Sequence, residues 1–339
     1  MEYSGVLVVG EQRGGSVHSV TYELLARGRT LADKLGVGLA CVVIGHELEA
    51  FGREIVERGA DIVYLIDDPC LEWFIPRRYS AELAALIEQI RPEIVLAAAT
   101  TAGRTLMPHV AAKLDTGLTA DCTGLDIDDK ERLLLQTRPA IGGNVMATIK
   151  TPSARPQMAT VRPKSARPLP RDLGRQGEIV VRAAACDDAQ CAGECLLGFV
   201  RDTSQDVSVQ DAEIVVAGGK GLKSRDNFRM VEELAGLLGA AVGATRDVVD
   251  LGWIGYPHQI GLSGKTVSPR LYVAIGLSGT IQHLAGMQTS ETIVAINKDK
   301  DAQIFRVADY GIVGDLFEVV PELIDKIRAA KNARLCGAR

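Results

Sequence analysis

Residues 271–283 read LYVAIGLSGTIQH, and this stretch decides the fold of the C-terminal half of the chain. The apolar run at residues 271–276 predicts a buried strand, and the small residues after it predict a tight turn. Residues 278–283 then open a helix that carries a hydroxyl, a glycine and a histidine. Such a turn lets backbone N–H groups approach an anion, and the helix start adds its positive dipole end. The stretch therefore predicts a phosphate or pyrophosphate site.

Other strand ends in the same half carry similar polar turns. Residues 292–299 (TIVAINKD) and 307–315 (VADYGIVGD) each join an apolar run to a polar turn. Residues 218–224 (GGKGLKS) follow another apolar run, and Lys220 and Lys223 in this turn suit a negative group. Because ligands of open α/β sheets bind at the carboxyl ends of the strands, we expect these turns to form one nucleotide site.

Length, charge and composition restrict the class of protein. A chain of 339 residues is long enough for two domains, each with its own core. The net charge of -5 does not favour nucleic acid or an anionic membrane as a partner, and no apolar run approaches the roughly 20 residues of a membrane span. The N-terminus has no signal-peptide layout, and the seven cysteines are irregularly spaced. These features predict a protein of the reducing cytoplasm.

The first half of the sequence alternates short apolar runs with helical patterns. Aromatic residues make up only 4% of the chain, which is typical of parallel sheets covered by helices. The expected strands are residues 5–9, 39–44, 61–66 and 93–98. The expected helices are residues 22–35, 48–58, 81–90 and 104–114. This order predicts parallel strands joined by right-handed crossovers.

The pattern changes from about residue 133. Four short apolar runs follow one another there without a helix between them, at residues 133–137, 145–149, 158–161 and 178–181. They predict a mainly antiparallel extension or edge. Residues 151–175 are rich in proline and arginine. This segment is either an anion-binding or partner-docking surface, or a loop with solvated arginines.

A change of composition at residues 183–198 marks the end of the first half. We place the linker at residues 202–209, with domains at residues 1–204 and 205–339. The second domain is expected to open with a strand at residues 213–217 and a helix at residues 227–238.

Other chemistries find weaker support. Cys186, Cys191 and Cys195 have C-x4-C-x3-C spacing, whereas metal and iron–sulfur sites normally show paired C-x2-C motifs. Three free thiols are therefore preferred to a cluster, and the five histidines are scattered. No G-x-S-x-G elbow supports a serine hydrolase, and residues 261–266 (GLSGKT) match only the end of a phosphate-loop motif.

Several longer motifs resemble one protein family. In the C-terminal half these are residues 218–224, 261–264, 278–287 (SGTIQHLAGM), 292–299 and 307–323 (VADYGIVGDLFEVVPEL). In the N-terminal half they are residues 11–13 (EQR), 116–126 (TGLTADCTGLD), 138–146 (RPAIGGNVM) and 155–163 (RPQMATVRP). Together they make the chain similar, over essentially its whole length, to the α-subunits of electron transfer flavoproteins.

The resemblance implies an α/β protein of two domains, each a mainly parallel sheet flanked by helices. The first is a nucleotide-hydrolase-like domain that packs on a β-subunit, and the second is a mobile, Rossmann-like domain that binds FAD. The resemblance also implies electron transfer to or from a flavin-dependent dehydrogenase of acyl-CoA or 2-hydroxy-acid type. The cofactor-binding residues that it implies are Lys220, Thr245, Arg246, Ile260, Gly261, Leu262, Ser263, Ser278, Gly279, Thr280, Ile281, Gln282, His283, Asn297, Asp315 and Leu316.

The resemblance assigns roles to several of these residues. It places the Arg246 guanidinium beside the isoalloxazine ring, where a cation favours the reduced, anionic flavin. It places the Ser263 hydroxyl near flavin N5 and lets His283 donate to the C2 carbonyl side. Residues 278–282 would cradle the pyrophosphate. The residues that would hold the adenosine and phosphate end are Lys220, Asn297 and Asp315.

Two residues depart from the common family pattern. Lys220 and Leu262 stand where many members have arginine and glutamine, so the phosphate contact loses its bidentate fork and the ring loses a polar neighbour. The loop at residues 255–266 (GYPHQIGLSGKT) and the N-terminal half look more like the electron-bifurcating branch. In that branch an NADH-oxidising flavin in the β-subunit splits electrons between ferredoxin and, through the α flavin, a dehydrogenase.

We favour the bifurcating type on these grounds. One alternative is an ordinary carrier between acyl-CoA dehydrogenases and a quinone reductase. The other is a non-redox nucleotide-binding module, which the fold alone would also permit.

Overall fold

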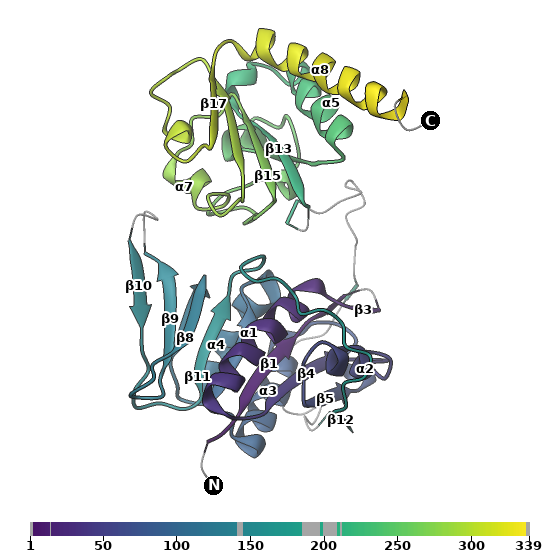
Figure 1. Ribbon diagram of the computed structural model, residues 1–339, viewed down its shortest axis with the longest axis vertical. Coiled ribbons are helices and arrows are strands. Elements are labelled where there is room, and N and C mark those ends of the chain that lie inside the picture. The colour runs from purple at the N-terminus through teal and green to yellow at the C-terminus, as the bar shows by residue number, and fades with distance from the viewer. Residues whose placement is uncertain are drawn as a thin grey trace. The chain divides into compact units, whose positions relative to one another are not determined.

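The computed structural model describes residues 3–13, 15–140, 145–184, 197–198, 209–210 and 212–336. The chain divides into two compact units, Met1–Phe199 and Val200–Arg339, which we call the N-terminal and C-terminal units (Figure 1). Each unit contains a parallel sheet flanked by helices, as predicted. Among the described residues, no helix is both long and apolar enough to cross a bilayer.

A seven-stranded sheet forms the centre of the N-terminal unit. Its strands, in spatial order, are β12 (Glu178–Arg182), β5 (Ile62–Asp67), β4 (Leu39–Gly45), β1 (Val6–Gly10), β6 (Ile94–Ala98), β11 (Gln157–Val161) and β7 (Leu118–Cys122). All neighbouring pairs are parallel. The four strands expected in the first half are therefore confirmed as β1, β4, β5 and β6.

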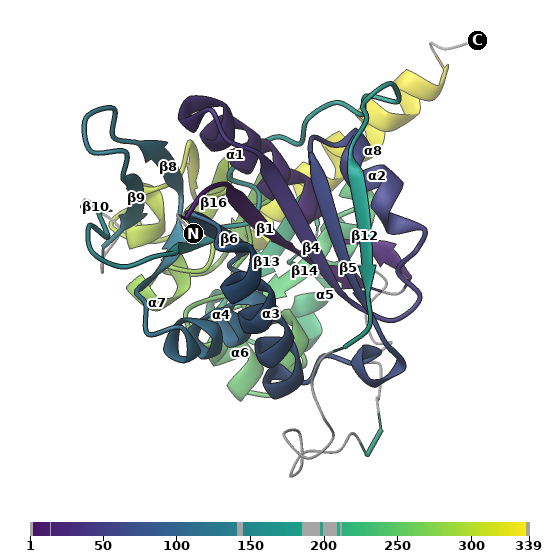
Figure 2. The same ribbon diagram turned by 90° about the horizontal axis from the view of Figure 1, so that it is seen from below.

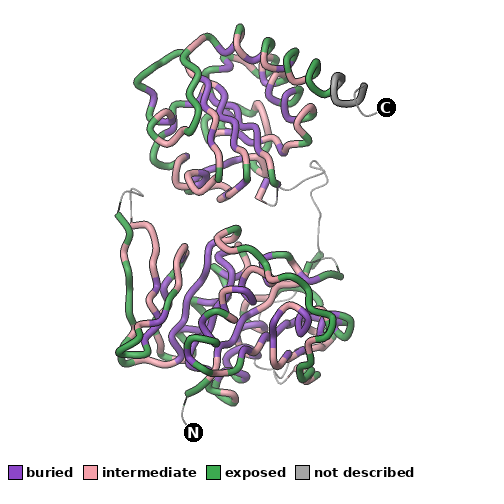
Figure 3. The backbone as a smooth tube through the Cα atoms, in the orientation of Figure 1, coloured by how far each residue is buried: buried purple, intermediate pink, exposed green. Residues whose placement is uncertain are grey.

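Helices cover both faces of this sheet. They are α1 (Ser19–Leu35), α2 (Phe51–Glu57), α3 (Pro76–Ile90) and α4 (Thr101–Lys113). Alternate residues of β1 point to opposite faces, so Val8 packs in one core with Leu24 of α1 and Leu7 packs in the other with Leu83 of α3. Figure 2 shows α3 and α4 side by side, and Figure 3 shows burial concentrated in the central strands.

The region after residue 133 was predicted only in part. A separate antiparallel sheet contains β8 (Gly124–Ile127), β9 (Leu134–Pro139) and β10 (Met146–Ile149), which confirms the first two of the four runs. The prediction is wrong for β11, which is a parallel strand inside the main sheet; β12 is an edge strand of that sheet, as predicted, but its pairing is parallel. The chain returns to β11 through this antiparallel sheet instead of through a helix. The usual sequence signal of a parallel crossover is therefore missing.

The arginines of residues 151–175 attach this segment to the rest of the N-terminal unit. Arg162 contacts both carboxylate oxygens of Asp121, and Arg171 contacts the buried Glu57. These contacts make the segment a strap, in which Arg162 and Arg171 bind carboxylates of the protein itself. Arg162 is buried, in contrast to the solvated arginines of the loop interpretation, whereas Arg171 stays partly exposed.

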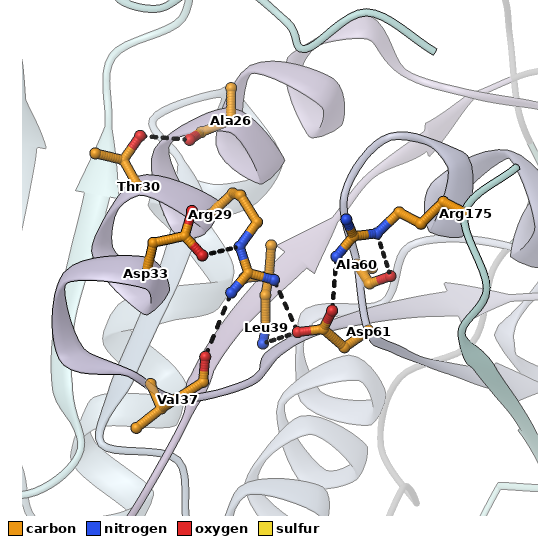
Figure 4. A network of polar contacts seen from close by, with 9 residues as sticks. All are labelled: Ala26, Arg29, Thr30, Asp33, Val37, Leu39, Ala60, Asp61 and Arg175. Atoms are coloured by element: carbon orange, nitrogen blue, oxygen red, sulfur yellow. Dashed lines mark hydrogen bonds and ion pairs between the residues drawn. The ribbon is translucent and has the colours of Figure 1, made fainter. Parts of the chain in front are cut away.

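Arg175 completes a polar network around Asp61, shown in Figure 4. Asp61 accepts hydrogen bonds from Arg29 at 2.8 Å, from Arg175 at 2.6 Å and from the backbone N–H of Leu39 at 2.8 Å. Burial raises the pKa of the Asp61 carboxyl, but these donors outweigh it and hold the pKa below its usual value. The network ties α1 and the strap to the sheet.

A five-stranded parallel sheet forms the C-terminal unit. Its strands, in spatial order, are β14 (Ala241–Ala244), β13 (Ile214–Gly218), β15 (Leu271–Ile275), β16 (Ile293–Asn297) and β17 (Tyr310–Val313). The helices are α5 (Arg229–Leu238), α6 (Arg246–Asp250), α7 (Ile281–Leu284) and α8 (Leu316–Cys336). The chain winds in one direction from β13 to β14 and in the other from β15 onward. The order therefore reverses between β13 and β15.

Shorter elements complete the two units. They are β2 (Gln12–Arg13), β3 (Ser16–Val17) and the 3-10 turns η1 (Pro69–Leu71), η2 (Lys220–Leu222), η3 (Asp226–Phe228), η4 (Tyr256–His258) and η5 (Gln303–Arg306).

Candidate cofactor site

A cavity of about 540 Å³ lies at the carboxyl ends of β13, β14, β15 and β16. This is the point at which the strand order of the C-terminal unit reverses, where doubly wound sheets bind their ligands. The turns predicted after three separate strands therefore open onto one cavity.

Thirteen of the sixteen residues predicted to bind the cofactor line this cavity. They are Lys220, Thr245, Arg246, Ile260, Gly261, Leu262, Ser263, Ser278, Gly279, Thr280, Gln282, His283 and Asn297. The cavity also contains residues that the sequence prediction missed: Gly221, Asp247, Gly276, Leu277, Asp299 and Ala302. Three of these, Gly221, Asp247 and Leu277, lie directly beside a predicted residue, so a wider window around each predicted residue would have found them.

Three predicted residues do not line the cavity. Ile281 is exposed, and Leu316 packs into the core between the sheet and α8. The Asp315 carboxylate accepts a hydrogen bond from the backbone N–H of Phe317 at 2.9 Å, at the start of α8. A role of these three residues in cofactor binding stays a prediction.

The turn after β15 is shaped by two glycines in the left-handed region. Gly276 has a φ of 60° and Gly279 a φ of 74°. A Cβ at Gly279 would lie 2.5 Å from the backbone nitrogen of Ile304, so even alanine does not fit without movement. The same nitrogen donates to the carbonyl oxygen of Ser278 at 3.0 Å, which fixes the turn against η5.

The N–H groups of this turn suit a phosphate. Within the described part of the chain, the backbone nitrogens of Ser278, Gly279 and Thr280 have no protein acceptor, although all three residues line the cavity. The helix that follows contributes less than expected, because α7 has only four residues and its dipole is correspondingly small. A pyrophosphate would therefore be held mainly by N–H groups of the turn.

The residues expected at the flavin ring lie on two other loops. Arg246 begins α6, and its Nε lies 3.2 Å from Asp250 in an exposed ion pair. The Ser263 hydroxyl accepts from the side-chain amide of Gln259 at 3.1 Å. Leu262 is exposed beside it, while its backbone N–H donates to the carbonyl oxygen of Gln282 at 2.7 Å. The Arg246 guanidinium and the Ser263 hydroxyl therefore both belong to residues that line the cavity.

Two predicted polar residues hold the turns of the cavity together. The Asn297 side-chain amide donates to the carbonyl oxygen of Leu277 at 2.8 Å, and its oxygen accepts from the backbone N–H of Asp299 at 3.0 Å. Lys220 lines the cavity, whereas the ammonium of Lys223 lies 4.7 Å from the centre of the Phe317 ring.

His283 is almost completely buried beneath the same cavity. Its Nε2 lies 2.9 Å from the hydroxyl of Tyr272, and its Nδ1 lies 3.1 Å from the carbonyl oxygen of Ile260. Burial lowers the pKa of the imidazole to about 4, so the ring is neutral at pH 7.

In the part of the chain that the structure describes, no group of three His, Cys, Asp or Glu is placed to hold a metal ion. Cys186, Cys191 and Cys195 lie outside the described residues.

A cavity with glycines, N–H groups that have no acceptor among the described residues and a cation, placed at the switch point of a doubly wound sheet, is typical of dinucleotide-binding proteins. Two family models agree with this class. Residues 6–187 match the model described as "Electron transfer flavoprotein domain", and residues 208–288 match "Electron transfer flavoprotein FAD-binding domain". The chain belongs to the electron transfer flavoprotein family and is similar to its alpha subunits over nearly its full length.

Curated relatives support the same assignment. The chain is 48% identical to the electron transfer flavoprotein subunit alpha of Thermoanaerobacterium thermosaccharolyticum, over 97% of this chain and 99% of the relative. It is 43% identical to the subunit of the same name from Megasphaera elsdenii, over 98% of each chain. It is 40% identical to the acryloyl-CoA reductase electron transfer subunit beta of Anaerotignum propionicum, over 98% of this chain and 97% of the relative.

Proposed function

We propose that the chain binds FAD in the cavity at the ends of β13–β16 and carries electrons as the α-subunit of a heterodimer. One observation carries the proposal. A single cavity contains thirteen residues expected at the flavin, together with a turn whose N–H groups have no acceptor among the described residues. The segment that supplies most of these residues also matches the FAD-binding family model.

Different residues of the cavity would bind different parts of the cofactor. FAD supplies the redox chemistry when it is bound. The N–H groups of residues 278–280 would hold the pyrophosphate, and Lys220 would add a point charge for phosphate. Arg246 would stabilise negative charge on the reduced flavin. Ser263 would offer its hydroxyl near N5, since its only described side-chain contact is with Gln259.

A β-subunit and a flavin-dependent dehydrogenase are the partners that this role requires. The N-terminal unit would pack on the β-subunit, and the C-terminal unit would move with FAD. The name of the Anaerotignum relative favours a dehydrogenase of acyl-CoA type. A 2-hydroxy-acid dehydrogenase is the other candidate. The irregularly spaced cysteines favour the cytoplasm as the compartment.

We also propose that the complex bifurcates electrons from NADH to ferredoxin and to the dehydrogenase. Support comes from the loop at residues 255–266 and from the identity of 48% and 43% to the alpha subunits of Thermoanaerobacterium thermosaccharolyticum and Megasphaera elsdenii. The exposed Leu262 at the cavity wall also fits, because it gives the flavin ring a different neighbour from the common glutamine.

Flavin stoichiometry of the co-purified heterodimer tests both proposals. Protein is denatured, flavin is quantified by absorbance, and AMP is assayed in the same extract. Two FAD per heterodimer without AMP support bifurcation, which NADH-driven ferredoxin reduction coupled to the dehydrogenase then checks. One FAD and one AMP support a simple carrier instead. A heterodimer without flavin, even after incubation with FAD, contradicts the proposed function and leaves a non-redox nucleotide-binding module.

A further inference from the structure

Gln259 is a buried residue at the start of the loop, residues 259–265, that carries Ser263. Its side chain belongs to a residue only 4% exposed, and its Nε2 donates to the Ser263 hydroxyl oxygen at 3.1 Å. Ser263 lines the cavity, whereas Gln259 does not. The buried amide can therefore influence a ligand in the cavity through the Ser263 hydroxyl.

The loop closes on itself around this contact. The carbonyl oxygen of Gln259 accepts from the backbone N–H of Lys265 at 2.7 Å. A Cβ at Gly264 would lie 2.4 Å from the same oxygen, so the two ends of the loop are in close contact. The hydroxyl of Tyr256 donates to the carbonyl oxygen of Ser263 at 3.0 Å. Ser263 is thus held at its backbone by one side chain and at its hydroxyl by another.

The contact with Gln259 determines what the Ser263 hydroxyl can offer to a ligand. An amide nitrogen only donates hydrogen bonds, so the hydroxyl oxygen uses one of its lone pairs to accept from Gln259. Among the described residues, the Ser263 hydroxyl has no acceptor of its own, and its proton stays available. A hydroxyl that already accepts a hydrogen bond is also a stronger donor, because neighbouring hydrogen bonds polarise one another.

We propose that Gln259 is a positioning residue that directs the Ser263 proton into the cavity and so makes Ser263 a hydrogen-bond donor to flavin N5. The inference rests on the proposed function for the identity of the ligand. N5 of the oxidised flavin has a lone pair and no proton, so it accepts from such a donor. Negative charge develops at this part of the ring on reduction, and the donor therefore binds reduced flavin more strongly than oxidised flavin.

The contact can be tested without any flavin. The flavin-free heterodimer is produced with 15N-labelled glutamine, and its side-chain NH2 signals are recorded by 1H–15N NMR. The signal of Gln259 is identified by its loss in Gln259→Met. We expect Ser263→Ala to shift this signal, and Ser263→Thr, which keeps a hydroxyl, to leave it close to its original position. A Gln259 signal that stays in place in Ser263→Ala would overturn the proposal, since the amide would then not donate to the hydroxyl.

The flavin potential tests what the contact does. Gln259→Met keeps a side chain of similar length but removes the amide donor. We expect it to weaken the binding of reduced FAD relative to oxidised FAD about 3- to 10-fold, which lowers the two-electron midpoint potential by about 15–30 mV. Ser263→Ala should lower the potential by at least as much. In the Ser263→Ala background, Gln259→Met should change the same ratio by less than about twofold, because the amide acts through the hydroxyl.

Gln136→Met is the matched control for the loss of a buried glutamine. Gln136 is fully buried in the N-terminal unit, and its Nε2 donates to the Thr151 hydroxyl at 3.3 Å. This variant should lose stability and leave the flavin potential unchanged. An unchanged potential in Gln259→Met, or an equal fall with and without the Ser263 hydroxyl, contradicts the positioning role. A heterodimer that binds no FAD contradicts the proposed function instead, while the amide signal of Gln259 still decides whether the contact exists.

Discussion

Replacing Gly279 with alanine is the most direct test of the turn that would hold the pyrophosphate. Gly279 lies in the left-handed region with a φ of 74° and lines the cavity. The new Cβ would lie 2.5 Å from the backbone nitrogen of Ile304. That nitrogen also donates to the carbonyl oxygen of Ser278, so Ile304 cannot move away from the new Cβ without moving the turn.

The size of the effect follows from this geometry. Ordinary contact begins at 3.4 Å, so the turn must move by 0.9 Å (3.4 − 2.5). A hydrogen bond of about 2.9 Å to a phosphate oxygen would then lengthen to about 3.8 Å and be lost. One lost bond to a charged group costs about 1.5–3 kcal/mol, which weakens FAD binding about 10- to 150-fold. The left-handed conformation itself costs alanine about 1–2 kcal/mol of stability.

Gly239→Ala is the matched control for the backbone cost. Gly239 ends α5 with a φ of 64°, has open space around its Cβ position and does not line the cavity. It should lose the same 1–2 kcal/mol of stability, roughly, and keep its FAD affinity within about twofold. Both quantities are measured on the heterodimer, by thermal unfolding and by titration of FAD into the flavin-free complex. If Gly279→Ala binds FAD within about threefold of Gly239→Ala, the assignment of this turn to the pyrophosphate is refuted.

Three further predictions concern charged residues. Arg246→Ala should lower the midpoint potential of FAD in a spectroelectrochemical titration, since a cation near the ring favours the reduced flavin. The stability of the protein should change by less than about 0.5 kcal/mol, because the Arg246 side chain is 67% exposed. An unchanged potential would contradict the role assigned to Arg246. Asp61→Ala should destabilise the N-terminal unit by about 1–3 kcal/mol at pH 7, and Asp33→Ala, which removes an exposed partner of the same Arg29, by less than about 0.5 kcal/mol. Folding lowers the pKa of Asp61, so its ionised carboxylate stabilises the folded state above the unfolded pKa, and this stabilisation is lost as the pH falls through the folded pKa. If calorimetry shows that Asp61→Ala loses the same stability at pH 3 as at pH 7, this reasoning is contradicted. Asp315→Ala should reduce the retention of FAD and leave the midpoint potential of the flavin nearly unchanged. It should also lower the stability of the protein by about 1 kcal/mol, because the start of α8 loses its cap. Full FAD occupancy after gel filtration would count against a binding role of Asp315.

The sequence predicts the fold best where an apolar run is followed by a helix. The strands β1, β4, β5 and β6 all have this signal, and so do β13 and β15 of the C-terminal unit. The signal fails for β11, although all five of its residues are buried and it lies between β6 and β7. Its connection runs through the antiparallel sheet of β8, β9 and β10, so the direction of β11 depends on contacts that sequence spacing does not contain.

The cofactor site follows the same division between local and distant information. Residues such as Ser278 and Gly279 are predictable because glycine, hydroxyl and strand end are neighbours in the sequence. The contact between Asp315 and Phe317 is equally local, yet residue type alone does not distinguish a helix cap from a ligand. The contact between Tyr272 and His283 joins a strand to the helix after the next turn, and only the folded backbone brings them together.

Residues chosen for their chemistry therefore separate, in the structure, into those that face the cavity with unused groups and those whose groups already hold the turns. The N–H groups of residues 278–280 are of the first kind within the described chain, and so is Arg246 apart from its exposed ion pair. Asn297 is of the second kind, since both polar ends of its side chain are bonded to the protein. Loss of the first kind would remove a proposed contact with the cofactor, whereas loss of the second kind would move a turn. Loss of Arg246 should therefore change the flavin potential, which responds to nearby charge, whereas loss of an N–H contact or movement of a turn should mainly change the affinity for FAD.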